Sequence, residues 1–558
     1  MTNTIKTLAP VIPASILSRK WSNYQEAFFE FVLNPVNGSC VTNAVAGSGK
    51  TTTSLACAIM ALSTFPVVNR TDFKTGETIR QSEILFLAFN KSIVKELAEK
   101  LLNDYNLRDK KDGIDVKTLH SQGMSALTKM YKKLYGCYPA KDWVDEKKWD
   151  TIITEQAIGL SSRALDDAGM SNAFVGNCID LFNKCRVELV RGGQFDRIEG
   201  VAEHYGIDLY ADEVNVVSNL LYTAYEVTPE NLRSIDYTDM VCIPAVNRNH
   251  KLWRYYTPKY QLVFVDECQD LNNAQRELLL GSISENGRFV AVGDRRQAIN
   301  GFAGASCDSF DLLKGLAGGH ELGLSVCYRC GKAMIELAKG IVPQIEAFEG
   351  AGEGEIRHSN ELDLKAGDMV LCRKSAPLVG LCLKLIAHGI GAKVKGRDIA
   401  DGLVALINKC KVKDIDRLFI ALDKEVEKLV KKLQTANVED IENNPRLIAL
   451  QDKVDCIKVL AENAKNANDI VDNLERLFSD DMENKNQFVI LSTIHKAKGL
   501  EADNVAILLP NKLPLVYKGQ KPWEYEQEKN LEYVAYTRAK KVLTFIDLDE
   551  DGLNKYKF

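Results

Sequence analysis

Short apolar runs alternate with helix-like segments near the start of the chain, and this alternation limits the possible folds more than any other feature. Ser39–Ala44 and Ile84–Phe89 are apolar runs of strand length. The residues after Gly49 and the amphipathic run Lys91–Leu102 have helical spacing. A strand, a crossover helix and a second strand form the unit from which parallel sheets are built. The sequence therefore predicts an α/β fold with a parallel sheet.

The same alternation returns later in the chain, after segments whose apolar spacing is helical. The 558 residues exceed what one hydrophobic core can use. Strand-like runs at Gln261–Val265 and Arg288–Val292 resume the first α/β region, and Asp368–Cys372 belongs to a second one. We therefore predict two α/β lobes with parallel sheets, each carrying a mainly helical insertion. The predicted boundaries are 1–120 and 231–318 for the first lobe, 121–230 for its insertion, 319–399 and 483–558 for the second lobe, and 400–482 for its insertion.

The charge and hydropathy of the chain exclude two classes of protein. Lys and Arg number 71 against 76 Asp and Glu, which gives −5 and excludes a uniformly basic coat for nucleic acid, but not a local basic groove. Apolar runs such as Gln261–Val265 are too short to cross a bilayer. The N-terminus lacks a basic region followed by a long apolar run. We expect an intracellular protein without membrane contact, cytoplasmic (nucleoid or viral-host cytoplasm) rather than nuclear.

The chain contains 14 cysteines, most of them single and inside apolar stretches. This pattern is typical of reduced cysteines in a core. Cys327 and Cys330 form the one close pair, with the spacing of a redox or zinc motif but without a second pair nearby. We therefore predict neither metal binding nor redox chemistry there.

A run of small residues, Ala44-Val-Ala-Gly-Ser-Gly-Lys-Thr51, links the first predicted strand to the first predicted helix. Small residues let the backbone wrap a phosphate, so that N–H groups and the helix N-terminus face the charge. Lys50 would reach the β- and γ-phosphates and the Thr51 hydroxyl would ligate Mg²⁺. A simple turn between strand and helix is the alternative, since Ala44 stands where the pattern has Gly. The predicted nucleotide-binding residues here are Ala46, Gly47, Ser48, Gly49, Lys50, Thr51 and Thr52.

Two adjacent carboxylates, Asp266 and Glu267, follow the apolar run that ends at Val265. In open parallel sheets, ligands bind at the carboxyl ends of the strands. Asp266 would hold Mg²⁺ and Glu267 would orient and deprotonate the attacking water. A solvated turn or a helix N-cap is the alternative for such a pair. The helical insertion accounts for the wide separation from Lys50 in the sequence.

Further motifs follow in a specific order along the chain, and together they span most of it. They are Ser22–Gln25, Leu87–Lys91, Lys117–His120, Val265–Asp270, Val292–Gln297, Cys327–Cys330, Ser492–Glu501 and Leu531–Arg538. In sequence and order these motifs resemble those of superfamily 1 helicases of the UvrD/Rep type, and within them the F-box DNA helicase branch. The resemblance implies two RecA-like P-loop lobes, with ATP and Mg²⁺ as cofactors bound in the cleft between them.

The resemblance assigns roles around the ATP. Gln25 would hydrogen-bond the adenine edge, Tyr328 would stack on the base and Glu501 would touch the ribose. Gln297 would sense the γ-phosphate, while Arg329 and Arg538 would reach it from the second lobe, where an arginine finger can contribute ~10³–10⁵ in rate. A surface salt bridge is the alternative for Arg538. The predicted catalytic set is Lys50, Glu267, Gln297, Arg329 and Arg538.

The resemblance also implies that single-stranded DNA runs across the tops of both lobes. Phe89 and Phe302 would be stacking platforms for bases. Because Phe89 ends a predicted buried strand, a place in the core is the alternative for it. Asn300 and Ala303 depart from the Tyr and Arg usual in this motif, which leaves step size and strength of duplex separation open. The other predicted nucleic-acid contacts are Asn90, Thr118, His120, Thr493 and His495.

These features lead to the expectation of an ATP-dependent DNA helicase that moves 3′ to 5′ on single strands and separates duplex, with hydrolysis coupled to closure of two lobes. The alternative is a DNA-stimulated ATPase that removes proteins, such as recombinase filaments, with little unwinding. A helicase–nuclease is disfavoured because residues 539–558 leave no room for a nuclease domain. An RNA motor stays open, since no motif recognisably contacts a 2′-OH. The expected partners are single-stranded DNA, its junctions with duplex, and replication, repair or recombination proteins, and the chain is expected to be monomeric.

Overall fold

The computed structural model divides by its internal contacts into two compact units. Unit 1 comprises Met1–Ala44, Gly49–Arg295 and Asn300–Leu324, and unit 2 comprises Val45–Ser48, Arg296–Ile299 and Ser325–Phe558. The structure describes residues 4–6, 12–66, 68–71, 78–107, 113–164, 168–207, 209, 212–250, 256–299, 301, 308–435, 440–442, 444–462, 464–478, 487–518, 520–549 and 552–553.

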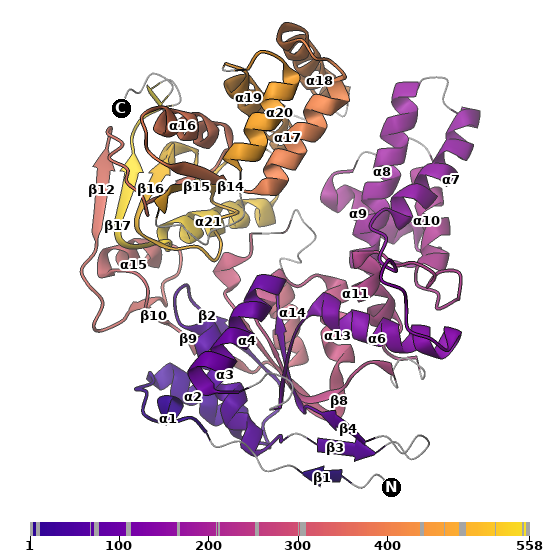
Figure 1. The fold of residues 1–558 in the computed structure, drawn as a ribbon, viewed down its shortest axis with the longest axis vertical. Helices are drawn as coiled ribbons and strands as arrows, with labels where there is room; N and C mark the ends of the chain where they lie inside the picture. Colours follow the sequence, from indigo (N-terminus) through magenta and orange to yellow (C-terminus); the bar gives the residue numbers. More distant parts are fainter. Residues whose placement is uncertain are drawn as a thin grey trace. The chain divides into compact units, whose positions relative to one another are not determined.

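Unit 1 is built on a six-stranded sheet in the order β6-β5-β7-β8-β2-β9, in which every neighbouring pair is parallel (Figure 1). The strand-like runs predicted in this part of the sequence are confirmed as β2, β5, β7 and β8. The strands are β2 (Cys40–Ala44), β5 (Ile84–Ala88), β6 (Ile114–Thr118), β7 (Tyr260–Val265), β8 (Ile283–Gly293) and β9 (Glu321–Leu324). A separate antiparallel sheet joins β1 (Thr4–Lys6), β3 (Val68–Thr71) and β4 (Thr78–Gln81).

Both faces of the six-stranded sheet are buried, which explains why β5 is a continuous apolar run rather than an alternating one. Successive side chains point to opposite faces, so Ile84 and Phe86 join one hydrophobic core while Leu85 and Leu87 join another. The first core also contains apolar residues of the helices α2 (Asn23–Leu33), α3 (Lys50–Met60) and α4 (Lys91–Tyr105). The second contains residues of α13 (Asn273–Gly281) and α14 (Ser309–Leu316). The short helix α1 (Ala14–Leu17) precedes them.

The predicted helical insertion of the first α/β region is confirmed as a run of helices, which Figure 1 shows beside α11. A buried network of ion pairs stabilises this run of helices. Arg186 pairs with Asp236 at 2.6 Å and with Asp239 at 2.9 Å, and Lys148 pairs with Asp239 at 2.8 Å. Removing one partner of such a network costs about 3–5 kcal/mol. The helices of the insertion are α6 (Leu119–Tyr135), α7 (Lys148–Ala164), α8 (Ala168–Val187), α9 (Phe195–Tyr205) and α10 (Glu213–Ala224), and α11 (Tyr237–Val246) follows them.

Unit 2 has its own six-stranded parallel sheet in the order β12-β17-β16-β13-β15-β14 (Figure 1). In β13, Val370 and Cys372 face one core while Met369 and Leu371 face the other, so this sheet is covered on both sides as well. The strands are β12 (Glu355–Ser359), β13 (Met369–Cys372), β14 (Ala392–Lys395), β15 (Val489–Thr493), β16 (Ala502–Leu508) and β17 (Ala539–Ile546). A short parallel pair joins β10 (Val326–Cys327) to β11 (Glu346–Ala347).

The predicted charged helical segment of the second α/β region is also confirmed. In α18 of this segment Leu418, Leu422 and Leu433 are buried, as expected for an amphipathic helix with a period of 3.6 residues. The helices of the insertion are α17 (Arg397–Cys410), α18 (Ile415–Thr435), α19 (Pro445–Ala461) and α20 (Ala467–Leu477). The other helices of unit 2 are α15 (Lys332–Lys339), α16 (Ala376–Ala387) and α21 (Pro522–Tyr536).

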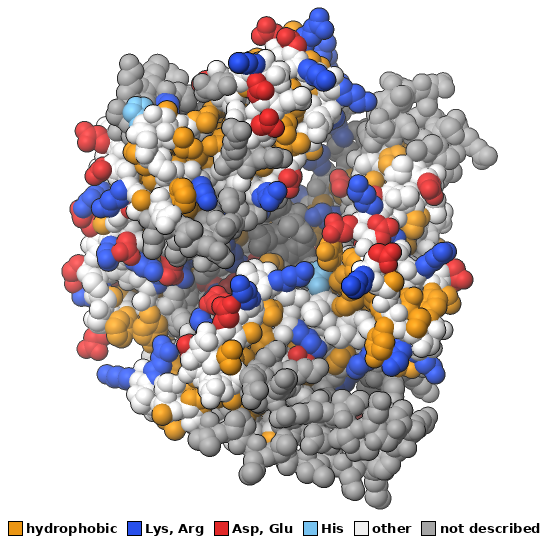
Figure 2. All heavy atoms as spheres, viewed as in Figure 1, with side chains coloured by type: hydrophobic (Ala, Val, Ile, Leu, Met, Phe, Trp, Pro, Cys, Tyr) orange, Lys and Arg blue, Asp and Glu red, His pale blue; other side chains and the backbone are white. Residues whose placement is uncertain are grey.

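The described surface carries charges of both signs. On the face drawn in Figure 2, the coloured Lys and Arg side chains alternate with Asp and Glu, as the net charge of −5 leads one to expect. Among the described helices, none combines the length and the apolar character needed to cross a membrane.

Candidate nucleotide and nucleic-acid sites

The predicted phosphate loop and carboxylates meet at one edge of the unit 1 sheet. Because β2, β7 and β8 are parallel and adjacent in the sheet, their carboxyl ends lie at the same edge. There Lys50 Nζ lies 3.0 Å from Glu267 Oε1, and the Thr51 hydroxyl donates to Asp266 Oδ2 at 3.0 Å. The structure thus brings together four predicted site residues that lie far apart in sequence.

The backbone of the loop fits a phosphate group. Gly47 and Gly49 have φ angles of 68° and 75°, a left-handed conformation that glycine adopts without a steric penalty. The helix α3 begins at Lys50, directly after Gly49, so its first N–H groups have no side-chain cap. Within the described residues, the Ser48 hydroxyl is buried without a hydrogen-bond partner. Donors of this kind at a helix N-terminus are suited to bind an anion.

The charges around Lys50 fit a magnesium nucleotide. Burial lowers the pKa of Lys50, but the carboxylates of Glu267, Asp294 and Asp266 outweigh it, so the pKa lies above its ordinary value. Burial, followed by repulsion from Glu267, raises the pKa of Asp266. The hydroxyl of Thr51 and the carboxylate of Asp266 offer oxygen atoms, which are the ligands that Mg²⁺ prefers.

Glu267 has an unusual backbone conformation, and its carboxylate is bonded by Gln269, to which the sequence analysis assigned no role. Its φ angle is 53°, in the left-handed region that costs a residue other than glycine about 1–3 kcal/mol. The Gln269 amide donates to Glu267 Oε2, and Gln269 Oε1 accepts from the Asp294 N–H at 3.0 Å. Gln269 is buried, so its side chain links the carboxylate to the end of β8. In the sequence, the signal for this role was a glutamine two residues after Glu267.

Gln25, predicted to contact adenine, is buried at the start of α2. Its Oε1 accepts from the Ser22 N–H at 3.0 Å in a capping box, and its Nε2 donates to Thr53 Oγ1 at 2.8 Å. The side chain is therefore fixed from two sides. Its role toward adenine stays a prediction.

In unit 2, two predicted site residues form an ion pair at the amino end of the sheet. Arg329 Nε lies 2.6 Å from Glu501 Oε2, and Lys540 Nζ lies 2.6 Å from Glu501 Oε1. Burial raises the pKa of Glu501, but hydrogen bonds and attraction from Lys540 and Arg329 outweigh it and lower the pKa below its ordinary value. Glu501 directly precedes β16, and no motif of the sequence analysis included Lys540.

Arg538 is not at the surface, so the alternative of a surface salt bridge is wrong. Its side chain is 1% exposed. The guanidinium donates to the carbonyls of Val534 at 2.9 Å and Leu500 at 3.1 Å, and to Thr537 Oγ1 at 3.1 Å. These bonds fix its position just before β17, and its role as an arginine finger stays a prediction.

The segment Val45–Ser48 of the phosphate loop belongs to unit 2 by its contacts. The Ala46 N–H donates to the hydroxyl of buried Tyr533 at 2.8 Å, and the Tyr328 N–H donates to the Gly47 carbonyl at 2.9 Å. Tyr533 lies inside a predicted motif but was given no role.

Two further predicted site residues are Gln297 and Thr52. Gln297 is buried and its carbonyl accepts from Lys498 at 2.9 Å, while Thr52 is half-buried in α3.

Predicted nucleic-acid contacts of unit 1 lie at the same sheet edge, beyond β7. Phe89 is 40% exposed, so the alternative of a core position is wrong. Asn90 caps α4 by accepting from the Ile93 N–H, and Thr118 caps α6 by accepting from the Ser121 N–H. Since Ala88 and Thr118 are partners in the β5–β6 ladder, the two capped helices start side by side. Phe302 lies outside the described residues, as do Asn300 and Ala303.

The remaining nucleic-acid candidates occupy the carboxyl edge of the unit 2 sheet. Thr493 ends β15, beside Cys372 at the end of β13, and His495 follows two residues later. Arg538 and Glu501 precede β17 and β16, so they lie at the opposite, amino edge. Within unit 2 the two predicted sets of residues are therefore on opposite edges of one sheet.

Two domain families match this sequence. Residues 26–316 match the UvrD/REP helicase N-terminal domain, and residues 405–550 match the UvrD-like helicase C-terminal domain. The first match spans more than half of the chain. This chain belongs to the UvrD/REP helicase family.

Individual relatives are distant. The chain is 24% identical over 323 residues to the probable DNA helicase II homolog of Mycoplasma genitalium, covering 54% of this chain and 40% of the relative. It is 28% identical over 323 residues to F-box DNA helicase 1 of Gallus gallus, covering 52% and 30%. It is 24% identical over 283 residues to the ATP-dependent DNA helicase Rep of Buchnera aphidicola, covering 50% and 38%. The matches span less than half the length of each of these relatives.

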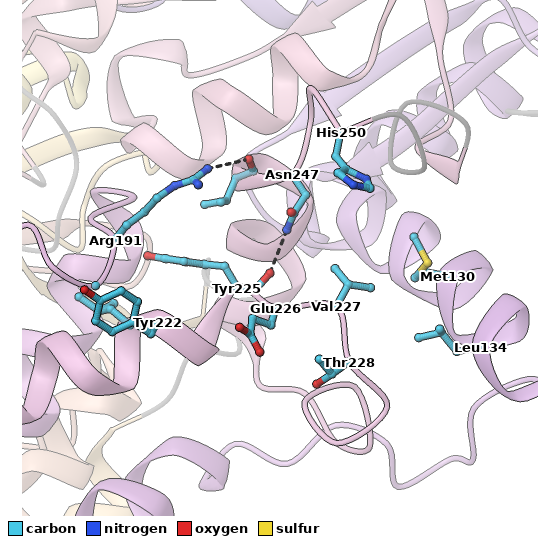
Figure 3. Close-up of a pocket in the computed structure, with 13 residues that line it drawn as sticks. Met130, Leu134, Arg191, Tyr222, Tyr225, Glu226, Val227, Thr228, Asn247 and His250 are labelled. Carbon is cyan, nitrogen blue, oxygen red and sulfur yellow. Dashed lines mark hydrogen bonds between the residues drawn. The ribbon is translucent and has the colours of Figure 1, made fainter.

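A cavity of about 700 Å³ lies within the helices of unit 1, away from the family motifs (Figure 3). Arg191 donates to the Val246 carbonyl at 3.4 Å and Asn247 donates to the Tyr225 carbonyl at 3.0 Å. Dashed lines from Arg191 and Asn247 mark these bonds in Figure 3. The described lining includes none of the predicted ATP or nucleic-acid residues. The cavity is therefore separate from the residues predicted to bind ATP and nucleic acid.

We expect Gly47→Ala to damage the nucleotide site of this UvrD/REP family member. A Cβ at Gly47 would lie 2.7 Å from Arg329 Cβ and 2.8 Å from Cys327 Sγ, in a left-handed conformation. A shift near 1 Å in a catalytic constellation can cost about 100-fold in rate, so ATP hydrolysis should fall by at least about tenfold. Gly38→Ala is the matched control, since a Cβ at Gly38 has no described neighbour within 4 Å. Equal rates for the two variants, measured with saturating single-stranded DNA, would contradict the assignment of this loop.

We expect His495 to remain neutral in the folded protein at physiological pH. Burial, followed by repulsion from Arg373 and Lys496, lowers its pKa to about 3. Burial and Lys91 also lower the pKa of His120. Both imidazoles would therefore contact DNA as hydrogen-bonding groups rather than as cations.

A lowered histidine pKa also predicts acid sensitivity. The imidazole of the unfolded chain has a pKa near 6.5 and binds a proton at a pH where the folded one stays neutral. The free energy of unfolding therefore falls as the pH drops below about 6.5. Between pH 7 and pH 5, His495 should account for about 1–2 kcal/mol of lost stability. Urea unfolding of the wild type and of His495→Gln at both pH values tests this. Equal acid sensitivity of the two proteins would show that His495 is not buried as a neutral group.

Proposed function

We propose that this chain is an ATP-dependent DNA translocase and helicase that moves 3′ to 5′ along single-stranded DNA. The observation that carries this proposal is the pairing of Lys50 with Glu267 and of Thr51 with Asp266 at one sheet edge, in a chain of the UvrD/REP helicase family. Relatives named as ATP-dependent DNA helicase Rep and DNA helicase II support it.

Different residues at this sheet edge would have different roles in ATP hydrolysis. Bound Mg²⁺ would neutralise charge on the β- and γ-phosphates, and Thr51 and Asp266 are the residues that would hold it. Lys50 would exchange its ion pair with Glu267 for phosphate oxygens. Glu267, still held by Gln269, would then orient a water molecule and accept its proton.

Coupling to movement would come from closure of two lobes during the ATP cycle, with Arg329 and Arg538 contributed by the second lobe. The order of strands in unit 1 supports such a coupling. The phosphate loop follows β2, the carboxylates follow β7, and the nucleic-acid candidates Phe89 and Thr118 lie at the ends of the next strands, β5 and β6. A shift at the carboxylates therefore needs to cross one strand position to reach Phe89 and two to reach Thr118.

Unwinding of forked DNA with either a 3′ or a 5′ single-stranded tail tests motor, direction and substrate together. We expect ATP-dependent strand separation only with the 3′ tail. ATP hydrolysis stimulated by single-stranded DNA, without strand separation on either fork, would favour the alternative of a protein-displacing ATPase, which release of a recombinase filament would measure directly. Hydrolysis stimulated by RNA but not by DNA would overturn the assignment of the polymer.

A further inference from the structure

Two exposed aromatic rings lie beside each other next to the Cys327–Cys330 motif. The short strands β10 and β11 pair in parallel, with Cys327 opposite Ala347. The residues that follow, Tyr328 and Phe348, are therefore neighbours, and the Phe348 N–H donates to the Cys327 carbonyl at 3.1 Å. The ring centroids of Tyr328 and Phe348 are 5.2 Å apart with planes at 43°. The pairing of these strands thus decides where the Phe348 ring lies.

Both rings remain open to solvent. Tyr328 is 42% exposed and Phe348 is 43% exposed, so neither ring fills a core. An aromatic pair is stabilised beyond the area that it buries, because the two rings attract each other. Such a contact restricts the orientation of the Tyr328 ring and leaves part of its surface available to another planar group.

The turn after Phe348 brings Gly350 close to the Phe348 ring. The Ala351 N–H donates to the Phe348 carbonyl at 2.9 Å, which closes a turn. A Cβ at Gly350 would lie 2.7 Å from Phe348 Cε1, so the ring occupies the space that a side chain at this position would need. Phe348 is thus fixed by its own turn while its ring contacts Tyr328.

Tyr328 itself is tied to the phosphate loop, because its N–H donates to the Gly47 carbonyl at 2.9 Å. We propose that Phe348 is a positioning residue for nucleotide binding, which fixes the Tyr328 ring so that the purine base of a nucleoside triphosphate stacks on it. This inference rests on the proposed function, since it adds a determinant of base binding to the same nucleotide site. Phe348 acts through Tyr328 and contacts no reacting atom.

The test compares Phe348→Ala with the wild type in ATP hydrolysis at saturating single-stranded DNA and in ATP binding by calorimetry. We expect KM and Kd for ATP to rise about three- to tenfold, the range that aromatic pairs of this kind supply, with kcat within about twofold, since only binding of the base is weakened. Phe348→Tyr keeps a ring and should stay within about twofold of the wild type. Phe195→Ala is the matched control, because Phe195 is similarly exposed, at 46%, on α9 of unit 1.

Two further measurements separate positioning from a general structural effect. Inorganic tripolyphosphate has no base, so its inhibition constant should be the same for Phe348→Ala and the wild type. If Phe348 acts through Tyr328, adding Phe348→Ala to Tyr328→Ala should change KM by less than about twofold. A weaker binding of tripolyphosphate, or additive effects in the double variant, would overturn the proposal.

The outcome also distinguishes this inference from the proposed function. A wild type that binds and hydrolyses ATP while Phe348→Ala leaves KM and Kd unchanged would overturn the role of Phe348 alone. A wild type that neither binds nor hydrolyses ATP would overturn both. Binding by calorimetry decides the role of Phe348 even if hydrolysis requires a partner protein.

Discussion

Lys50→Ala should abolish ATP hydrolysis, with a loss of at least about 10²–10³-fold, because it removes the positive charge that faces the transferred phosphoryl group. In the structure this ammonium is almost buried and pairs with Glu267 at 3.0 Å. Its pKa is raised above the ordinary value, so it stays charged at every physiological pH. Binding of single-stranded DNA should persist, since the nucleic-acid candidates of unit 1 follow other strands.

Measurement of ATP turnover and of DNA affinity by fluorescence anisotropy checks this prediction. Loss of Lys50 leaves Asp266 and Glu267 without their cation, which can cost about 3–5 kcal/mol of stability, so retained DNA affinity also serves as the test of folding. Lys339→Ala is the control, because Lys339 lies in an exposed ion pair with Glu336 on α15. Survival of DNA-stimulated hydrolysis in Lys50→Ala would mean that the phosphate loop is assigned wrongly.

Glu267→Gln should reduce kcat by about 10²–10⁴-fold, the range attributed to a general base, while ATP remains bound. The amide keeps the size of the carboxylate and can still bond to Gln269, but it cannot accept a proton from water at neutral pH. Removal of one negative charge beside the phosphates should leave ATP affinity equal or higher. The variant would therefore trap the nucleotide before cleavage.

Retention of radiolabelled ATP during gel filtration, measured beside steady-state hydrolysis, checks the second prediction. Glu336→Gln, an exposed change on α15, should behave like the wild type. If Glu267→Gln loses ATP binding and hydrolysis in equal measure, Glu267 supports the structure of the site and is not the base. Its left-handed φ angle of 53° would then be explained by the turn after β7 alone.

Local patterns in the sequence were sufficient to predict the main strands and helices, and one contact of the predicted nucleotide site. Apolar runs predicted β5 and β7 because both faces of a parallel sheet are buried, and helical spacing predicted the helices of the two insertions. The contact between Thr51 and Asp266 followed from the same reasoning, since the loop that precedes Thr51 begins at the end of β2, Asp266 directly follows β7, and parallel strands end at one edge. The core alternative for Phe89 was wrong because the buried part of β5 ends at Ala88.

The sequence by itself determined the α/β alternation, the predicted phosphate loop and the family to which the chain belongs, because each of these depends on the order of neighbouring residues in the sequence. Only the tertiary structure decided that Gln269 holds Glu267, that Tyr533 binds the loop at Ala46, and that Phe348 lies against Tyr328. The physical reason is that such contacts depend on the register of neighbouring strands and the packing of helices, which join residues remote in sequence and leave no periodic trace in either segment.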